Sequence, residues 1–216
     1  MAAMKILNWS LRASSRHPGF WLGVALALVA GPALTLANPA HFTPRTPDIS
    51  TLSYELAFVF SLLGGLLAIP RLRELHPLTT RRGFLQRCSL EVAVVVVHAF
   101  GLGMLCGWTW WIEWPPGAAA LGLALLVTTL FWAAMLRALA SLGVPSSAHA
   151  PMLLAIAALM AINITAVPLL PLARGASSSA SAQSLFTPAA LAADFASISS
   201  LFVVAWCCGS PLARRS

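Results

Sequence analysis

Long apolar stretches separated by short polar ones run through the whole chain. A helix rises about 1.5 Å per residue, so about 20 apolar residues cross a hydrocarbon layer about 30 Å thick. Six stretches approach that length and predict six transmembrane helices: Phe20 to Ala37, Leu52 to Ile69, Leu90 to Trp108, Ala118 to Leu136, Pro151 to Leu170 and Pro188 to Gly209. We therefore expect an all-α, polytopic membrane protein whose transmembrane domain covers residues 20 to 209.

Residues 1 to 19 are too polar to cross a bilayer and too apolar to form a free tail. Lys5, Arg12 and Arg16 are spaced among apolar residues there, which predicts an interfacial helix on the cytoplasmic face. A cleavable signal peptide also starts with basic residues. However, the apolar run from Phe20 to Ala37 is longer than the usual apolar region of such a peptide, so we interpret it as a retained first span.

Composition supports a membrane protein and disfavours a nucleic-acid partner. Hydrophobic residues make up 59% of the chain and charged residues only 9%, whereas about a quarter of the residues in a soluble domain are charged. The net charge is +7. The basic residues lie in the gaps between apolar runs, without interleaved aromatic residues, so they indicate topology and we expect no nucleic acid to bind.

The basic residues also orient the chain. If both termini are cytoplasmic, only Arg45 and Arg174 of the 13 Lys and Arg residues fall on the outer side. Basic residues near the ends of spans resist translocation, so this orientation is strongly favoured. Residues 210 to 216 then form a cytoplasmic tail, and we expect the protein in the inner (plasma) membrane of a bacterium.

The longest polar interruption between two spans reads RLRELHPLTTRRGFLQR, from Arg71 to Arg87, within a cytoplasmic segment at residues 71 to 89. Its candidate partner-coupling residues are Arg71, Arg73, Glu74, Arg81, Arg82 and Arg87. Its leucines, at positions 72, 75, 78 and 85, suit one face of a short helix on the membrane surface. Pro77 is expected to break that helix near His76. We interpret this segment as the surface that meets a soluble partner.

Polar residues inside predicted spans are costly and are therefore candidate functional residues. They are Glu55, Glu91, His98, Asn163 and Asp194. Glu91 follows Arg87 by one helical turn, so a local ion pair is favoured over proton chemistry. Glu55 lies near the outer end of its span, where its carboxylate can reach the interface.

His98 has two interpretations. It is a weak candidate for a haem ligand or a proton relay, but we favour a hydrogen bond to a neighbouring helix. Asn163 is also expected to bond between helices. Asp194 aligns with Ala190, Ser197 and Ser200, a stripe that we expect to face protein or water.

Other features concern packing and the outer boundary. Small residues predict close contacts between helices at Ser61, Gly64, Gly65, Gly103 and Gly107. The segment WTWWIEWPPG predicts an aromatic anchor in the outer headgroup layer, although an aromatic binding box around Glu113 is an alternative.

The sequence carries no Walker A motif, no dinucleotide-binding glycine motif, no H-E-x-x-H and no serine nucleophile elbow. Its four cysteines, at positions 88, 106, 207 and 208, lack the spacing of metal ligands. We therefore expect a protein that is not an enzyme by itself and holds no metal or cofactor.

The order of elements resembles the membrane (permease) subunit of type-2 ABC transporters, and the size and layout resemble the haem-exporter subunit of cytochrome c maturation. AIPRLRELHPLTTRRGFLQRCSLEV is similar to the family's cytoplasmic coupling segment, and SLFTPAALAADFASI is similar to its entry into the last span. The family often has a Glu followed by Gly in the coupling segment, whereas Leu75, His76 and Pro77 follow Glu74 here.

This resemblance implies two partners: a cytoplasmic ATPase subunit, and a second membrane subunit that is either another copy of this chain or a paralogue. The alternative is an accessory or scaffold subunit of a multi-subunit membrane redox or photosynthetic complex, in which a cofactor lies near His98.

Overall fold

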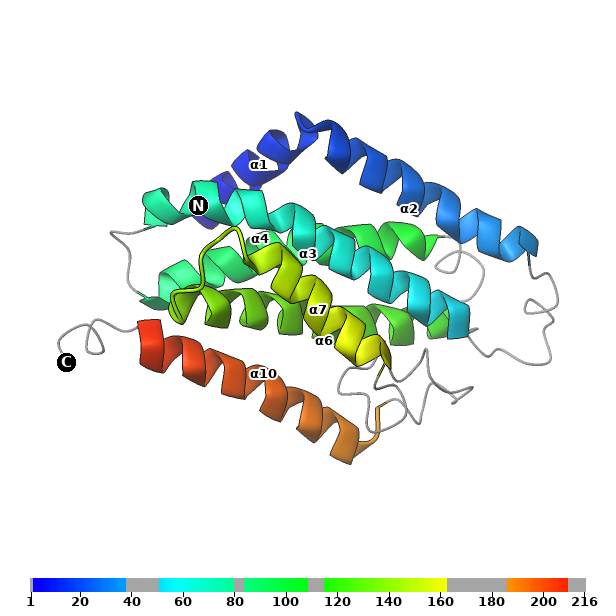
Figure 1. Cartoon of the computed structure of the whole chain (residues 1–216). Helices are drawn as coiled ribbons and strands as arrows, with labels where there is room; N and C mark the ends of the chain where they lie inside the picture. Colours follow the sequence, from blue (N-terminus) through cyan, green and yellow to red (C-terminus); the bar gives the residue numbers. More distant parts are fainter. Residues whose placement is uncertain (1, 38–50, 80–83, 109–114, 163–185, 210–216) are drawn as a thin grey trace.

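The computed structural model describes residues 2–37, 51–79, 84–108, 115–162 and 186–209. Within these ranges every regular element is an α-helix and there is no strand. The helices are α1 (Ala2–Ser15), α2 (Pro18–Ala37), α3 (Thr51–Thr79), α4 (Phe84–Cys106), α6 (Pro115–Ser141), α7 (His149–Ile162) and α10 (Pro188–Gly209) (Figure 1).

Four of these helices, α3, α4, α6 and α10, are long and apolar enough to cross a membrane. They correspond to the second, third, fourth and sixth predicted spans. The apolar parts of α2 and α7 are shorter, Pro18–Ala30 and His149–Met160. The fifth predicted span continues past Ile162, outside the described residues. The all-helical class therefore agrees with the prediction, and four of the six predicted spans correspond to helices that are long and apolar enough to cross a membrane.

The long helices lie side by side, and α4 runs in the opposite direction to α3, α6 and α10 (Figure 1). At one end of the bundle α3, α6 and α10 finish and α4 starts. The terminal residues at this end are Thr79, Ser141, Gly209 and Phe84. We call this the inner end, because its residues are those that the basic residues assign to the cytoplasm. Antiparallel neighbours follow from short connections between successive helices.

The middle of the bundle is packed most tightly where α3 meets α4. A Cβ atom at Gly64 would come within 2.5 Å of the Cα of Ala99 and would also strike the carbonyl oxygen of His98. The two backbones therefore touch, which only glycine permits. On the next interface, a Cβ at Gly103 would come within 2.5 Å of the Leu125 side chain. The close contacts predicted at these two glycines are confirmed.

Trp132 fills the space between these helices. It is fully buried, and its ring packs against Phe58 and Phe131, with ring centroids 5.7 and 5.5 Å away. Its indole Nε1 donates a hydrogen bond of 3.3 Å to the hydroxyl of Ser61. The large aromatic side chain of α6 thus meets the small residue on α3, which leaves its polar atom satisfied inside the apolar core.

A proline in α2 explains one contact at the opposite end of the bundle. Pro32 has no N–H, so the carbonyl of Leu28, four residues earlier, lacks its usual helical donor. The indole Nε1 of Trp108 donates to that carbonyl at 3.1 Å. Trp108 was expected at an outer aromatic boundary, and here it also ties the end of α4 to α2.

One local prediction was wrong. We expected Pro77 to break a separate surface helix, but α3 runs without interruption from its apolar part to Thr79. Pro77 lies in the last turn, so its missing N–H removes a single hydrogen bond where the helix ends anyway. The pair between Arg71 and Glu74, at 2.8 Å, and the fully buried Leu75 hold this extension in helical form.

Candidate functional site: a polar cavity at the inner end

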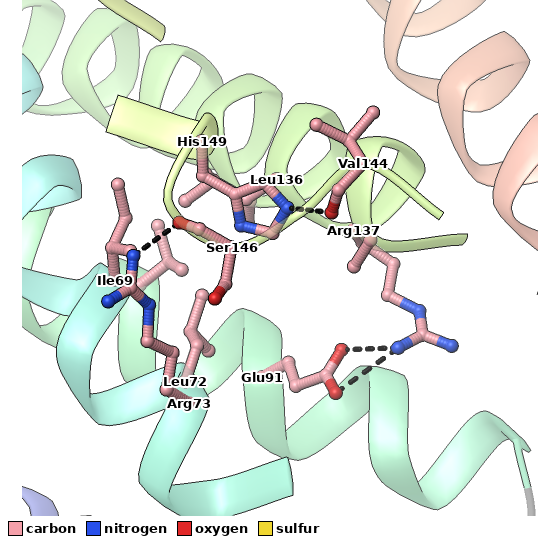
Figure 2. Close-up of a pocket in the computed structure, with 12 residues that line it drawn as sticks. Ile69, Leu72, Arg73, Glu91, Leu136, Arg137, Val144, Ser146 and His149 are labelled. Atoms are coloured by element: carbon pink, nitrogen blue, oxygen red, sulfur yellow. Dashed lines mark hydrogen bonds and ion pairs between the residues drawn. The ribbon is translucent and has the colours of Figure 1, made fainter. Parts of the chain in front are cut away.

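A cavity of about 370 Å³ opens between α3, α4, α6 and the loop that joins α6 to α7. Its volume lies in the range of small-molecule sites, which is about 300 to 1,000 Å³. Figure 2 shows its lining. The lining residues are Ile69, Leu72, Arg73, Glu91, Val95, Ala133, Leu136, Arg137, Ala140, Val144, Ser146 and His149.

Charge is distributed unevenly along the cavity. The lining residues nearest the middle of the bundle are apolar, namely Ile69, Val95 and Ala133. One helical turn closer to the inner end, the same three helices contribute Arg73, Glu91 and Arg137 in their place. Because the helix rises about 5.4 Å per turn, the cavity changes from apolar to charged over a short distance.

Glu91 and Arg137 form the central ion pair. Nη1 of Arg137 lies 2.9 Å from one carboxylate oxygen of Glu91 and 3.2 Å from the other (Figure 2). Both side chains are largely buried, with 6% of Arg137 and 12% of Glu91 exposed. The pair joins α4 to α6, and separating two charges this deeply buried is unfavourable.

Arg137 has further contacts that extend the link to a third helix. Its guanidinium carbon lies 5.0 Å from the centre of the Phe84 ring, a cation–π geometry. Phe84 in turn meets Trp206 of α10 edge to face, with centroids 4.8 Å apart. The Nε atom of Arg137 is buried, and it has no hydrogen-bond partner among the described residues. Thus α4, α6 and α10 are joined at the inner end through one arginine.

Arg73 links α3 to the α6–α7 loop. Its guanidinium donates a hydrogen bond to the carbonyl oxygen of Ser146, 73 residues away in sequence (Figure 2). That acceptor is neutral. Arg71, two residues earlier, instead pairs with the carboxylate of Glu74. The last part of α3, from Arg71 to Thr79, therefore carries two arginines with different partners. A carboxylate neutralises Arg71, whereas Arg73 bonds to the loop between α6 and α7.

His149 closes the loop from the start of α7. Its Nε2 lies 3.1 Å from the carbonyl oxygen of Val144, so this nitrogen carries the proton and donates it to the carbonyl (Figure 2). Burial lowers the pKa of His149 below its ordinary value of 6.5; the bond to Val144 opposes this shift and nearby Arg73 adds to it. The neutral form therefore fits this position.

The sequence identified Glu91 as a paired carboxylate but suggested a different partner. We expected Arg87, one turn away on the same helix, and the structure places Arg137 of α6 on the carboxylate. Arg137, Ser146 and His149 were not among the predicted site residues. The sequence offered one signal for Arg137, which directly follows the apolar run that ends at Leu136. We used this arginine only to orient the chain in the membrane.

His98 lies outside this cavity and bonds between helices, as the favoured interpretation predicted. Its Nδ1 lies 2.8 Å from the carbonyl oxygen of Val94, and its Nε2 lies 2.6 Å from the hydroxyl of Ser14 in α1. Since a carbonyl only accepts, Nδ1 donates and the Ser14 hydroxyl donates to Nε2. Both ring nitrogens are thus engaged, and a ligand role would require breaking the bond to Ser14.

The remaining predicted residues are not brought together. Glu55 is exposed, and Asp194 is buried on α10 with 1% of its surface exposed. Ser200, expected to face protein or water with Asp194, is exposed and donates to the carbonyl of Ser197 in its own helix. Arg81, Arg82 and Asn163 lie outside the described residues.

No group of three metal-ligating side chains that would suit a metal ion occurs in the described residues. No protein-family model, curated protein or solved structure matches this chain. The functional assignment therefore depends on the chemistry and position of the residues themselves.

Proposed function

We propose that this chain is the membrane-spanning, non-catalytic subunit of an ABC-2-type transport complex that works with a separate cytoplasmic ATPase. In this proposal the chain has six spans and cytoplasmic termini, lies in the inner membrane of a bacterium and pairs with a second membrane subunit. The segment from Arg71 to Arg87 binds the ATPase.

The observation that carries the proposal is the linkage at the inner end. Arg73, within the proposed coupling segment, bonds to the α6–α7 loop, while Arg137 bonds to Glu91 of α4. Phe84 and Trp206 continue the linkage to α10. A force applied to the end of α3 would therefore reach several long helices through these side-chain contacts. This is what a subunit driven by a partner requires.

The distribution of apolar side chains supports a bilayer around the bundle. In α1, Ser10 and Ser14 face the other helices and are buried, whereas Met4 is 77% exposed. A soluble helix would show the opposite orientation. Large apolar residues are also exposed on α2 and α10: Trp21, Leu22, Leu26, Val29, Phe195, Val203 and Trp206.

The position of α10 supports a second membrane subunit. It packs chiefly on α6, and only 17% of its most apolar stretch is buried in the bundle. Its outer face is therefore available to lipid or to another membrane helix. The bonds on both nitrogens of His98 give no support to the alternative of a redox subunit with a cofactor at that residue.

The proposal is tested by tagging the chain in its native membrane and identifying the proteins that co-purify in mild detergent. We expect a nucleotide-binding protein that is lost from the double variant Arg81→Gln/Arg82→Gln. Arg12→Gln/Arg16→Gln is the matched control, because it removes the same charge from the predicted cytoplasmic side at another place. Absence of any ATPase, or equal retention by both variants, would contradict the proposal.

A further inference from the structure

The inner-end cavity has the polarity of a site for an amphiphile. Ala133 and Ala140 both line it and lie on the same helix. Seven residues of helix span about 10 Å, so this is its approximate depth. Apolar side chains surround the deeper part, and the charged groups lie at the inner end. A ligand that fits has an apolar portion directed toward the middle of the bundle and a polar head near the predicted membrane surface.

The charge of the cavity selects the sign of that head group. Two arginines line it against one carboxylate, so its net charge is +1 with His149 neutral. Glu91 neutralises Arg137. In the described part of the chain Arg73 has no carboxylate within ion-pair distance. Its hydrogen-bond partner is the carbonyl oxygen of Ser146, which carries no charge.

Donors remain for an anion at this place. A guanidinium has five N–H donors, and Arg73 directs one of its nitrogens at Ser146. The cavity thus contains a cation that no carboxylate of the described residues compensates, and this cation has N–H donors left for an anion.

We infer that this cavity binds an anionic amphiphile, with its phosphate or carboxylate head at Arg73 and its acyl chain between Ile69, Val95 and Ala133. Basic pockets between membrane helices on the cytoplasmic side suit acidic lipid head groups. The inference goes beyond the proposed transport role and does not depend on it, since the site lies wholly within this chain and requires no ATPase.

The test uses the full-length chain purified in dodecyl maltoside, an uncharged detergent, with three probes. Octanoyl lysophosphatidic acid has the anionic head and a chain short enough for the depth of the cavity, octanoyl lysophosphatidylcholine has the same chain with no net charge, and inorganic phosphate has no chain. Binding is measured by calorimetric titration. We expect one saturable site for lysophosphatidic acid, with the two other probes binding at least about tenfold more weakly.

Two variants place the site. Arg73→Gln removes the proposed head-group contact, and we expect it to weaken lysophosphatidic acid binding about tenfold or more. Ala140→Phe fills the cavity from an exposed position without changing the charge, and we expect it to abolish binding. Arg12→Gln removes an exposed charge from α1 and should leave the affinity unchanged. An unchanged melting temperature in each variant shows that the fold is intact.

The inference fails if lysophosphatidylcholine binds as tightly as lysophosphatidic acid, because the site would then recognise only the chain. It fails equally if phosphate alone matches lysophosphatidic acid, which would indicate a site for a soluble anion. Binding that survives both Arg73→Gln and Ala140→Phe would place the ligand elsewhere on the protein and overturn the assignment.

Discussion

The middle of the bundle and its inner end use the same three helices in opposite ways. In the middle, α3 and α4 touch backbone to backbone at Gly64, and Trp132 fills the space beside them. At the inner end the same helices enclose a cavity of about 370 Å³ lined by two arginines and a glutamate. The difference lies in the side chains: small residues let helices close, whereas long charged ones hold them apart and need polar partners.

This contrast separates a rigid part from an adjustable part. Dense apolar packing has few alternative arrangements, because any shift opens voids or creates clashes. Ion pairs and hydrogen bonds to loop carbonyls can exchange partners, so the inner end can respond to a ligand or a partner while the middle stays fixed. The predictions below test whether the two regions differ in this way.

The largest effect is expected from adding a methyl group at Gly64, where the backbones of α3 and α4 touch. In Gly64→Ala the new methyl group meets the backbone of His98 and Ala99, which cannot rotate away. We expect a loss of about 3 kcal/mol or more, at the upper end of overpacking costs. Gly65→Ala is the control, because its nearest neighbour would be 3.6 Å away in ordinary contact. Similar melting temperatures for the two variants would refute the tight contact.

The next largest effect is expected at the inner end. Glu91→Gln leaves the buried guanidinium of Arg137 without its counter-charge, and we expect a loss of about 2–3 kcal/mol. The double variant Glu91→Gln/Arg137→Gln removes both charges and should recover part of that stability. Glu55→Gln, at an exposed carboxylate, is the control. Additive losses in the double variant would mean that the two residues do not form a pair.

A smaller effect is expected where α1 joins the bundle. Ser14→Ala removes the donor to Nε2 of His98, and hydrogen bonds between membrane helices contribute about 1 kcal/mol. Hydrogen exchange should therefore rise selectively in α1. Ser15→Ala is the control, since that hydroxyl bonds to the carbonyl of Arg12 in its own helix. Equal exchange in both variants would show that the bond does not hold α1.

The smallest effect concerns pH. Because the pKa of His149 is lowered in the folded state, the unfolded chain binds more protons as the pH falls through 6.5. Its contribution to stability is complete above that pH and is lost below it. The charged neighbours in the cavity are Arg73, Glu91 and Arg137.

We therefore expect melting temperatures measured from pH 7.5 to 5 to fall less steeply for His149→Gln than for the unchanged chain. Parallel curves would show that His149 does not contribute to the pH dependence of the folded state.

The sequence alone determined the helical class and four of the long apolar helices, because a run of about 20 apolar residues satisfies its backbone groups only as a helix in a bilayer. It also indicated Gly64 and Gly103 as contact points, since small residues have few other uses on an apolar helix. It did not determine the continuation of α3 through Pro77, because the cost of a proline depends on how close the helix end lies.

Only the tertiary structure decided which polar groups meet. Glu91 had a plausible partner one turn away, but Arg137 lies 46 residues further along the chain and reaches it through the packing of α4 on α6. Ser14 and His98 are 84 residues apart and come together because α1 folds back on α4. Periodicity reports which face of one helix is apolar. The partner on another helix depends on how several helices pack together, and no local pattern records that.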